Sequence, residues 1–313
     1  MVSFAEFDQM PNLRQEIMEK GLHTGLGIPQ DVAIYLDNGA FQFLTKGKEI
    51  SLKEYRDFVK RAKPDWYVIP RDYIPAPHMS DTEQLECLRK TMRVNKIFSK
   101  DGYVPVIHIG RYLERYLQEF QSDIHLRKKQ KVALGGIVPN LLRARKAMPY
   151  QDILDGLRYV RAQMSDKNLH VFGIGGVATL HLAALLGIDS VDSSGWRNRA
   201  AYGLVQLPGK GDRMIANLSS WRGRPPSKEE WEILEACQCP ACSQFGVEGL
   251  KARGIHGFCN RATHNLWILL EEARQIEDHL ANGTYGSWYA QHVENSVYRP
   301  LIDYIWQRRQ SDL

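Results

Sequence analysis

Two aspartates in this sequence each follow directly after an apolar run that predicts a buried strand. Asp37 ends the run that begins at Val32, and Asp192 ends the short run 188–191 and precedes a Ser-Ser-Gly turn. Aspartate is a poor strand former, and a single one at a strand end usually caps a turn or a helix. Other apolar runs end in the same way, at Asp72, His108, Gly135-Gly136 and Gly173. We interpret these converging strand ends as the rim of an active site, where paired carboxylates supply acid–base and nucleophilic chemistry.

A cysteine cluster near the C-terminal end forms a second motif. Cys237, Cys239 and Cys242 lie within six residues, a spacing at which three thiolates reach one tetrahedral Zn²⁺ ion. The fourth ligand is Cys259, His256 or His264, and the spacing alone does not choose among them. Four protein ligands leave no open position, so the predicted zinc is structural. The five cysteines are odd in number and clustered, which indicates a reducing, cytoplasmic location rather than a disulfide framework.

The elements that must position these residues alternate regularly along the chain. Strands are expected at 32–36, 66–69, 103–107, 132–134, 170–172 and 188–191, with helices at 51–62, 81–99, 111–120, 150–164 and 178–186. Such alternation predicts an α/β fold with a parallel sheet. A doubly wound open sheet and a (β/α)₈ TIM barrel are the two alternatives. Strand-like runs at 202–206 and 214–218 supply further strands and favour the barrel, whose active sites lie at the carboxyl ends of the strands.

The barrel interpretation divides the chain into three parts. We predict that residues 1–225 form the main part of the barrel, that residues 226–275 form an inserted zinc-binding subdomain, and that residues 276–313 form a C-terminal helical segment closing the barrel. The run Gly173-Ile174-Gly175-Gly176 lacks the full spacing of a dinucleotide-binding turn, and we expect it to allow close packing rather than to bind phosphate.

Composition and net charge indicate which kinds of partner the protein could bind. The chain has 313 residues, 43% of them hydrophobic and 25% charged, which is ordinary for a globular protein. Its formal net charge of +5 permits nucleic acid as a partner without requiring it. The N-terminal residues are charged, unlike a secretory signal, and apolar runs such as 182–188 are too short to span a bilayer, so we expect no membrane partner.

Taken together, the motifs resemble those of the tRNA-guanine transglycosylase superfamily, which implies a (β/α)₈ barrel with an inserted zinc subdomain. Four stretches carry the resemblance: Asp37-Asn38-Gly39-Ala40-Phe41-Gln42, Leu134-Gly135-Gly136-Ile137, Gly187-Ile188-Asp189-Ser190-Val191-Asp192, and the Cys237–Cys242 motif with His264-Asn265-Leu266. The last of these implies that His264 is the fourth zinc ligand. Zinc subdomains in this family can form subunit contacts, so a homodimer is an open alternative.

Several positions depart from the family pattern. Asn38 and Ala40 replace a serine and a glycine, Arg71-Asp72-Tyr73 replaces Asp-Glu-Cys, and His108 occupies the position of a base-reading glutamine. Ser193-Ser194-Gly195-Trp196-Arg197 replaces the segment that begins Pro-Thr-Arg, and the chain is short, with no appended RNA-binding domain. These departures are similar to the DpdA-type branch, which implies that DNA is the polymer and that a free 7-deazaguanine, such as 7-cyano-7-deazaguanine, is the incoming base. Accessory DNA-opening proteins are then expected as partners.

The resemblance also implies a mechanism and assigns residues to it. Asp192 would attack C1′ of the sugar and form a covalent ester, and Asp37 would carry the proton between the departing and incoming bases. Base-binding residues would be Asn38, Phe41, Asp72, His108, Gly135 and Gly136. Trp196, Arg197 and Arg199 would contact the nucleic acid, with the arginines holding flanking phosphates.

Three rival interpretations remain. The nearest is a tRNA-directed transglycosylase with the same chemistry. A metal-dependent barrel hydrolase is disfavoured, because no His-x-His pair marks the first strand. A non-catalytic nucleic-acid-binding zinc subunit is disfavoured by the presence of both Asp37 and Asp192.

Overall fold

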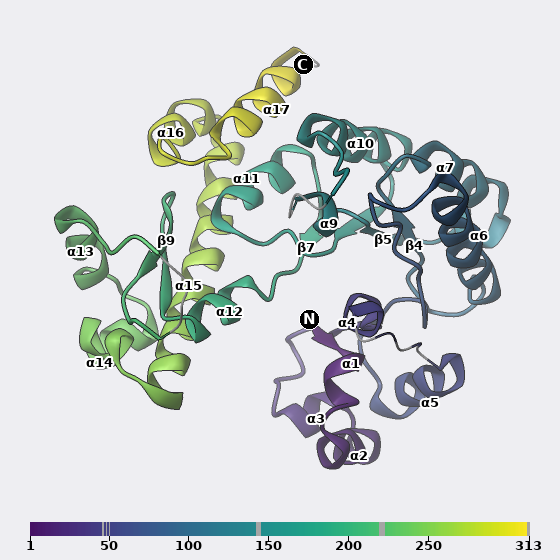
Figure 1. The fold of residues 1–313 in the computed structure, drawn as a ribbon, viewed down its shortest axis with the longest axis horizontal. Coiled ribbons are helices and arrows are strands. Elements are labelled where there is room, and N and C mark those ends of the chain that lie inside the picture. The colour runs from purple at the N-terminus through teal and green to yellow at the C-terminus, as the bar shows by residue number, and fades with distance from the viewer. Residues whose placement is uncertain (46, 48, 50, 142–144, 219–222, 312–313) are drawn as a thin grey trace. The chain divides into compact units, whose positions relative to one another are not determined.

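The structure is a computed structural model that describes residues 1–313 except 46, 48, 50, 142–144, 219–222 and 312–313 (Figure 1). The chain divides into two compact units, Met1–Phe172 and Gly173–Leu313, which are described one after the other. No helix in the described part of the chain has the length and apolarity that a membrane-spanning segment needs.

The first unit begins with short parallel strands and the helices that cover them. β1 (Val2–Ser3) pairs with β2 (Tyr35–Asp37), and β2 pairs with β3 (Trp66–Tyr67), in both cases parallel. The helices are α1 (Phe4–Phe7), α2 (Pro11–Lys20), α3 (Leu22–Leu26), α4 (Ala40–Thr45) and α5 (Leu52–Ala62). Ser51 caps α5 by accepting the Glu54 N–H, and the helix buries its apolar face. Phe4 packs edge-on against Tyr55 and Phe58 of that face, with ring centroids 5.2 and 5.3 Å apart, so the N-terminal segment is part of the core.

The rest of the first unit repeats the strand–helix alternation. β5 (Lys131–Gly135) lies between β4 (Val106–His108) and β6 (Asn168–Val171) and pairs parallel with both. The helices are α6 (Asp81–Ile97), α7 (Leu113–Ser122), α8 (Ile124–Arg127), α9 (Val138–Leu141) and α10 (Tyr150–Gln163). A reciprocal capping box between Ser80 and Glu83 starts α6 where the sequence predicts it. The register places His108 opposite Gly135, so two predicted strand-end residues are neighbours.

The second unit is mostly helical. In chain order it contains α11 (Val177–Leu185), β7 (Ser190–Val191), α12 (Gly195–Ala201), β8 (Leu204–Leu207), β9 (Gly211–Met214), α13 (Lys228–Glu235), α14 (Pro240–Lys251), α15 (Gly254–Ala281), α16 (Tyr285–His292) and α17 (Arg299–Ser311). The 28-residue α15 passes α11, α12, α14 and β8 and contacts each of them (Figure 1). It is therefore the element around which this unit is built.

The predicted α/β class with parallel strands is confirmed, but the two last strands differ from the expectation. β8 and β9 pair antiparallel, and β9 covers Gly211–Met214, so the strand predicted at 214–218 is wrong. Residues 208–210 form a turn between them, which is much too short for the crossover that parallel strands require. Closure of a barrel and the division at residues 225 and 275 stay predictions.

Candidate active site

Asp37 ends β2, and its carboxylate is held by groups on both sides of it in the sequence. Asp37 Oδ2 accepts hydrogen bonds from Ser3 Oγ at 3.0 Å and from the Gly39 N–H at 2.9 Å. Gly39 has a φ of +81° and packs so closely on Ala5 that a side chain would collide there. Gly39, two residues after Asp37, is thus required for the turn that orients the Asp37 carboxylate.

The predicted base-binding residues Asn38, Asp72 and His108 form one buried cluster. Asn38 Nδ2 donates to Asp72 Oδ1 at 2.8 Å and to the Ile69 carbonyl at 2.9 Å, and its Oδ1 accepts the Ala40 N–H. Asp72 Oδ2 lies 3.2 Å from His108 Nε2, and the His108 side chain is fully buried. Asp72 Oδ1 is therefore engaged by Asn38, whereas Oδ2 lies close to a His108 nitrogen that forms no hydrogen bond with the described residues.

The two glycines at the end of β5, Gly135 and Gly136, make room for His108. A Cβ on Gly135 would lie 2.7 Å from His108 Nδ1, and a Cβ on Gly136, whose φ is +79°, would lie 2.9 Å from the Ile109 carbonyl oxygen. Neither ring nitrogen of His108 has a hydrogen-bond partner among the described residues, although Nε2 lies near Asp72. Phe41, another predicted base-binding residue, lies on α4 with 46% of its surface exposed.

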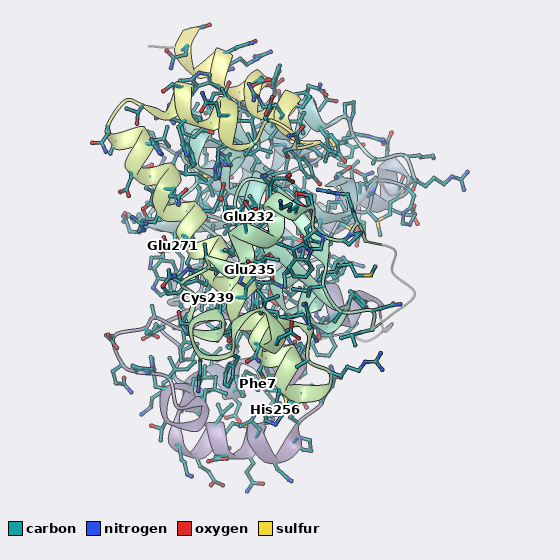
Figure 2. All side chains as sticks on the ribbon, turned by 90° about the vertical axis from the view of Figure 1, so that its left-hand side faces the viewer. Phe7, Glu232, Glu235, Cys239, His256 and Glu271 are labelled. Carbon is teal, nitrogen blue, oxygen red and sulfur yellow. The ribbon has the colours of Figure 1, made fainter. Side chains whose placement is uncertain are left out.

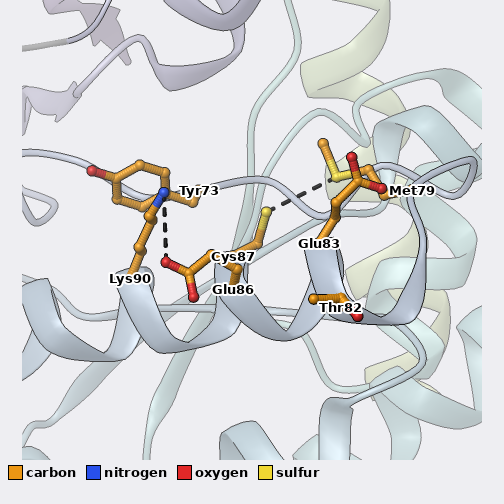
Figure 3. A pocket seen from close by; sticks show the side chains of 7 residues that line it. All are labelled: Tyr73, Met79, Thr82, Glu83, Glu86, Cys87 and Lys90. Atoms are coloured by element: carbon orange, nitrogen blue, oxygen red, sulfur yellow. Dashed lines mark hydrogen bonds and ion pairs between the residues drawn. The ribbon is translucent and has the colours of Figure 1, made fainter.

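A pocket of about 350 Å³ lies between Tyr73, the residue after Asp72, and α6 (Figure 3). Met79 and Cys87 approach each other on one side of it, and Lys90 pairs with Glu86 on the other. Burial raises the pKa of the Cys87 thiol, which keeps it neutral and poorly nucleophilic. The lining contains none of the predicted base-binding residues, so we do not assign the base to this pocket.

Asp192, the predicted nucleophile, follows β7 in the second unit. Its Oδ1 accepts the Gly173 N–H at 2.9 Å. Gly175 lies so close to Ser193 that a side chain there would collide with it. The Gly173–Gly176 run thus provides close packing, as expected, and it does so against the turn that carries Asp192.

The three predicted nucleic-acid contacts lie on α12. Arg197 is exposed, whereas Trp196 packs against the cluster of Ile268 and Leu269 on α15. Arg199 Nε lies 2.7 Å from both carboxylate oxygens of Asp212. A phosphate contact by Arg199 stays a prediction, and it would require this ion pair to open.

Cys237, Cys239, Cys242 and His264 form the predicted metal centre, and their candidate ligand atoms all lie within 4.8 Å of one another. His264 Nδ1 lies 3.5, 3.6 and 3.5 Å from the three sulfurs in that order. With Zn–S and Zn–N bonds of about 2.3 and 2.05 Å, a tetrahedral ion places sulfur and nitrogen about 3.6 Å apart. The donor set and distances therefore fit structural zinc, with His264 placed where the fourth ligand would be. Figure 2 labels the buried Cys239 near Glu232, Glu235 and Glu271.

Residues next to His264 on α15 connect the zinc centre to α12. His264 Nε2 lies 3.0 Å from the Gln206 carbonyl, which orients the ring. Asn265, fully buried, accepts the Gln206 N–H at 2.8 Å and donates to the carbonyls of Trp196 and Leu204 at 3.1 and 3.2 Å. Arg261, 1% exposed, donates to the Ala200 carbonyl at 2.8 Å.

The contacts of Asn265 and Arg261 with α12, and that of Ser3 with Asp37, were not predicted from the sequence. The local signal for the first two is their spacing on a helix: residues 261, 264 and 265 share one face, because i, i+3 and i+4 positions are neighbours. Ser3 gives no such signal, since it meets Asp37 through strand pairing.

A family model described as queuine tRNA-ribosyltransferase, or TGT, matches residues 8–297. The chain belongs to this family. Among curated TGT relatives, the tRNA-guanine(15) transglycosylase of Pyrococcus abyssi (strain GE5 / Orsay) is 26% identical over 309 residues, covering 93% of this chain and 48% of the relative. The protein of the same name from Pyrococcus furiosus is 27% identical, covering 87% and 43%, and that from Methanosarcina mazei is 28% identical, covering 87% and 52%. The chain thus spans about half the length of the curated relatives it matches.

Membership of the TGT family agrees with the resemblance noted in the sequence and with the zinc centre. The DpdA-type branch is not specifically supported. The names of these relatives specify tRNA rather than DNA. They therefore agree better with the tRNA-directed interpretation than with the expected DNA polymer.

Proposed function

We propose that this protein is a base-exchanging glycosyltransferase that replaces guanine in tRNA. The observation that carries the proposal is the match to the TGT family over residues 8–297, together with an aspartate held by a backbone N–H at each of the two family motifs. Support for tRNA comes from the names of the relatives, tRNA-guanine(15) transglycosylase. The DNA interpretation rested on sequence departures such as His108, and the comparisons give it no support.

In the proposed reaction, one Asp192 carboxylate oxygen forms a bond to C1′ as the bond from C1′ to guanine N9 breaks. Asp37 gives a proton to the departing guanine and later removes one from N9 of the incoming base. The incoming base then attacks C1′, and the ester bond to Asp192 breaks, so the carboxylate is regenerated. No external oxidant or water is consumed.

The incoming base is proposed to be a 7-deazaguanine. Replacing N7 by carbon leaves the pyrimidine-ring edge of guanine unchanged, so one set of protein groups can accept both bases. Asp72 and Asn38 are candidates for that set, with Phe41 as a stacking partner. Because Asp72 Oδ1 accepts a hydrogen bond from Asn38, the base would have to share or displace that contact, or bind Oδ2 beside His108.

Zinc is proposed to act through structure alone. The ion joins α14 to α15, and α15 holds α12 through Asn265 and Arg261. Because α12 begins three residues after Asp192, an intact metal centre would keep the loop of the nucleophile in place. Arg197 on the exposed side of α12 is then a candidate phosphate contact.

The first experiment is incorporation of labelled guanine and of labelled 7-cyano-7-deazaguanine into three polymers: unmodified tRNA, duplex DNA and single-stranded DNA. We expect label in tRNA and none in either DNA. Asp192→Asn should abolish incorporation, because the amide keeps the contact with the Gly173 N–H but is a poor nucleophile. Asp189→Asn, an exposed aspartate in the same segment, is the matched control and should retain activity. Label in DNA alone would refute the choice of polymer, and exchange by the Asp192→Asn protein would refute the mechanism.

A further inference from the structure

A second group of metal-ligating side chains lies in the unit Gly173–Leu313, apart from the cysteines. His181 on α11, Glu272 on α15 and His292 at the end of α16 place their candidate ligand atoms within 4.8 Å of one another. Glu272 Oε1 lies 2.9 Å from His181 Nε2 and 2.8 Å from His292 Nε2. The side chains of His181 and Glu272 are 0% and 1% exposed, whereas that of His292 is 15% exposed.

The cluster places a carboxylate in the interior with hydrogen-bond donors around it. Burial alone would raise the pKa of Glu272, but hydrogen bonds from His181 and His292 hold it below its ordinary value. Glu272 Oε2 also lies 3.3 Å from the Gly209 nitrogen, which donates to it. Buried charges in proteins are normally paired or coordinate metals. Two imidazoles and one carboxylate around a single point therefore form a site suited to a cation.

The distances agree with six-coordinate binding through the two Nε2 atoms and Oε1. With bonds of about 2.0–2.1 Å, two ligand atoms at a right angle lie about 2.9 Å apart, as the oxygen and each nitrogen do here. Two imidazoles that share one ion through Nε2 have ring centroids at most about 6.5 Å apart. The His181 and His292 centroids are 6.1 Å apart, so both rings can reach the same ion.

The surrounding residues fix both rings in the orientation that binding needs. The Tyr285 hydroxyl lies 2.8 Å from His181 Nδ1, the type of outer contact that sets the tautomer of a metal-bound histidine. Trp288 stacks on His181 and on His292, with interplanar angles of 25° and 24°. Each ring is thus held with its edge toward Glu272, and the partly exposed His292 offers a route of entry.

We propose that His181, Glu272 and His292 bind a divalent transition-metal ion at a site separate from the zinc centre. Imidazole with carboxylate suits Zn²⁺, Ni²⁺, Co²⁺ or Fe²⁺, and water would complete the coordination shell. For the ion to bind, the Nε2 proton of each histidine moves to Nδ1, so that Nε2 presents its lone pair. In His181, Nδ1–H then donates to the Tyr285 oxygen, and the carboxylate of Glu272 neutralises one of the two positive charges of the ion. The site would tie α11, α15 and α16 together, and it does not depend on the proposed base exchange.

The test uses the full-length zinc-loaded protein and Co²⁺ as the probe. The protein is equilibrated with excess Co²⁺, freed of unbound metal by gel filtration, and analysed for both metals by mass spectrometry. We expect one zinc and one cobalt per chain, with weak d–d absorption and no thiolate-to-cobalt charge-transfer band. A total of one metal per chain would overturn the proposal, whether that metal is zinc or cobalt that has replaced it. This measurement needs no variant.

Three variants locate the site. His292→Ala should lose cobalt while keeping zinc, because it removes one of three protein ligands at the partly exposed end of the cluster. Tyr285→Phe should still bind cobalt, about 10- to 100-fold more weakly, as expected when an outer contact is lost. His279→Ala is the matched control: His279 stacks on Trp288 at 4.3 Å and is not part of the ligand cluster, so cobalt binding should be unchanged. Unchanged binding by the His292→Ala protein would overturn the assignment.

Discussion

Replacing Asn265 by alanine tests whether the zinc-bearing helix holds the segment that follows Asp192. The side chain is fully buried and makes three hydrogen bonds, to the Gln206 N–H and to the carbonyls of Trp196 and Leu204. Alanine leaves one donor and two acceptors without this partner, at about 1–3 kcal/mol each. The free energy of unfolding should therefore fall by at least about 3 kcal/mol.

The same helix offers a matched control. Asn260 is partly buried and makes one hydrogen bond, from Nδ2 to the Gly249 carbonyl at 3.0 Å, away from α12. Asn260→Ala should lower the free energy of unfolding by about 1 kcal/mol. The difference between the variants, about 2 kcal/mol, corresponds to about 30-fold in the folding equilibrium and is measurable by urea denaturation.

The rate of tRNA capture provides a second comparison between the two variants, and a general loss of stability would not make these rates differ. At a temperature where both variants are folded, Asn265→Ala should slow capture of tRNA by the nucleophile much more than Asn260→Ala does, because only Asn265 contacts the backbone of α12. Equal stability losses and equal capture rates in the two variants would refute the connection from the zinc centre through α15 to α12.

Further predictions concern metal, packing and pH. Removing zinc with a strong chelator should unfold the segment around α14, because metal binding and folding are coupled, and circular dichroism during chelation would show it; chelation without spectral change would contradict this. Gly135→Ala should cost about 1–3 kcal/mol through collision with His108, whereas Gly110→Ala, with nothing within 4 Å of its added Cβ, should be nearly neutral in thermal unfolding. Hydrogen bonds from Arg213 lower the pKa of Glu230 to about 2, so the ionised form stabilises the fold above about pH 4.5 and this contribution is lost as the pH falls toward 2. Glu230→Gln should therefore cost up to about 3 kcal/mol at neutral pH, with the difference from wild type shrinking below pH 4.5, and a pH-independent difference would contradict the assignment.

Local rules predicted much of the fold. The alternation of strands and helices in the first unit follows from apolar periodicity, and the start of α6 follows from Ser80 and Glu83, which lie within one helical turn. The positions of Asp37 and Asp192 at strand ends were predicted for the same reason, since each belongs to its own apolar run. The zinc ligands followed from cysteine spacing, and the choice of His264 followed from the family resemblance.

These local rules could not predict contacts between residues that are far apart in the sequence. β8 and β9 pair antiparallel because a short turn joins them, although each run taken alone resembles a barrel strand. Arg199 pairs with Asp212, and His181 meets Glu272, which lies 91 positions away in the sequence. Substituted residues such as His108 favoured DNA as the polymer, and the comparisons give DNA no support, because substitutions at single positions do not identify the polymer.

Identification of the residue that bonds to the sugar tests the central claim most directly. The protein is incubated with tRNA, denatured in acid, digested with nuclease and protease, and analysed by tandem mass spectrometry. We predict a nucleotide attached through an ester to Asp192, and no adduct in the Asp192→Asn protein. Guanine exchange without any adduct, or an adduct on Asp37 or another residue, would contradict the account.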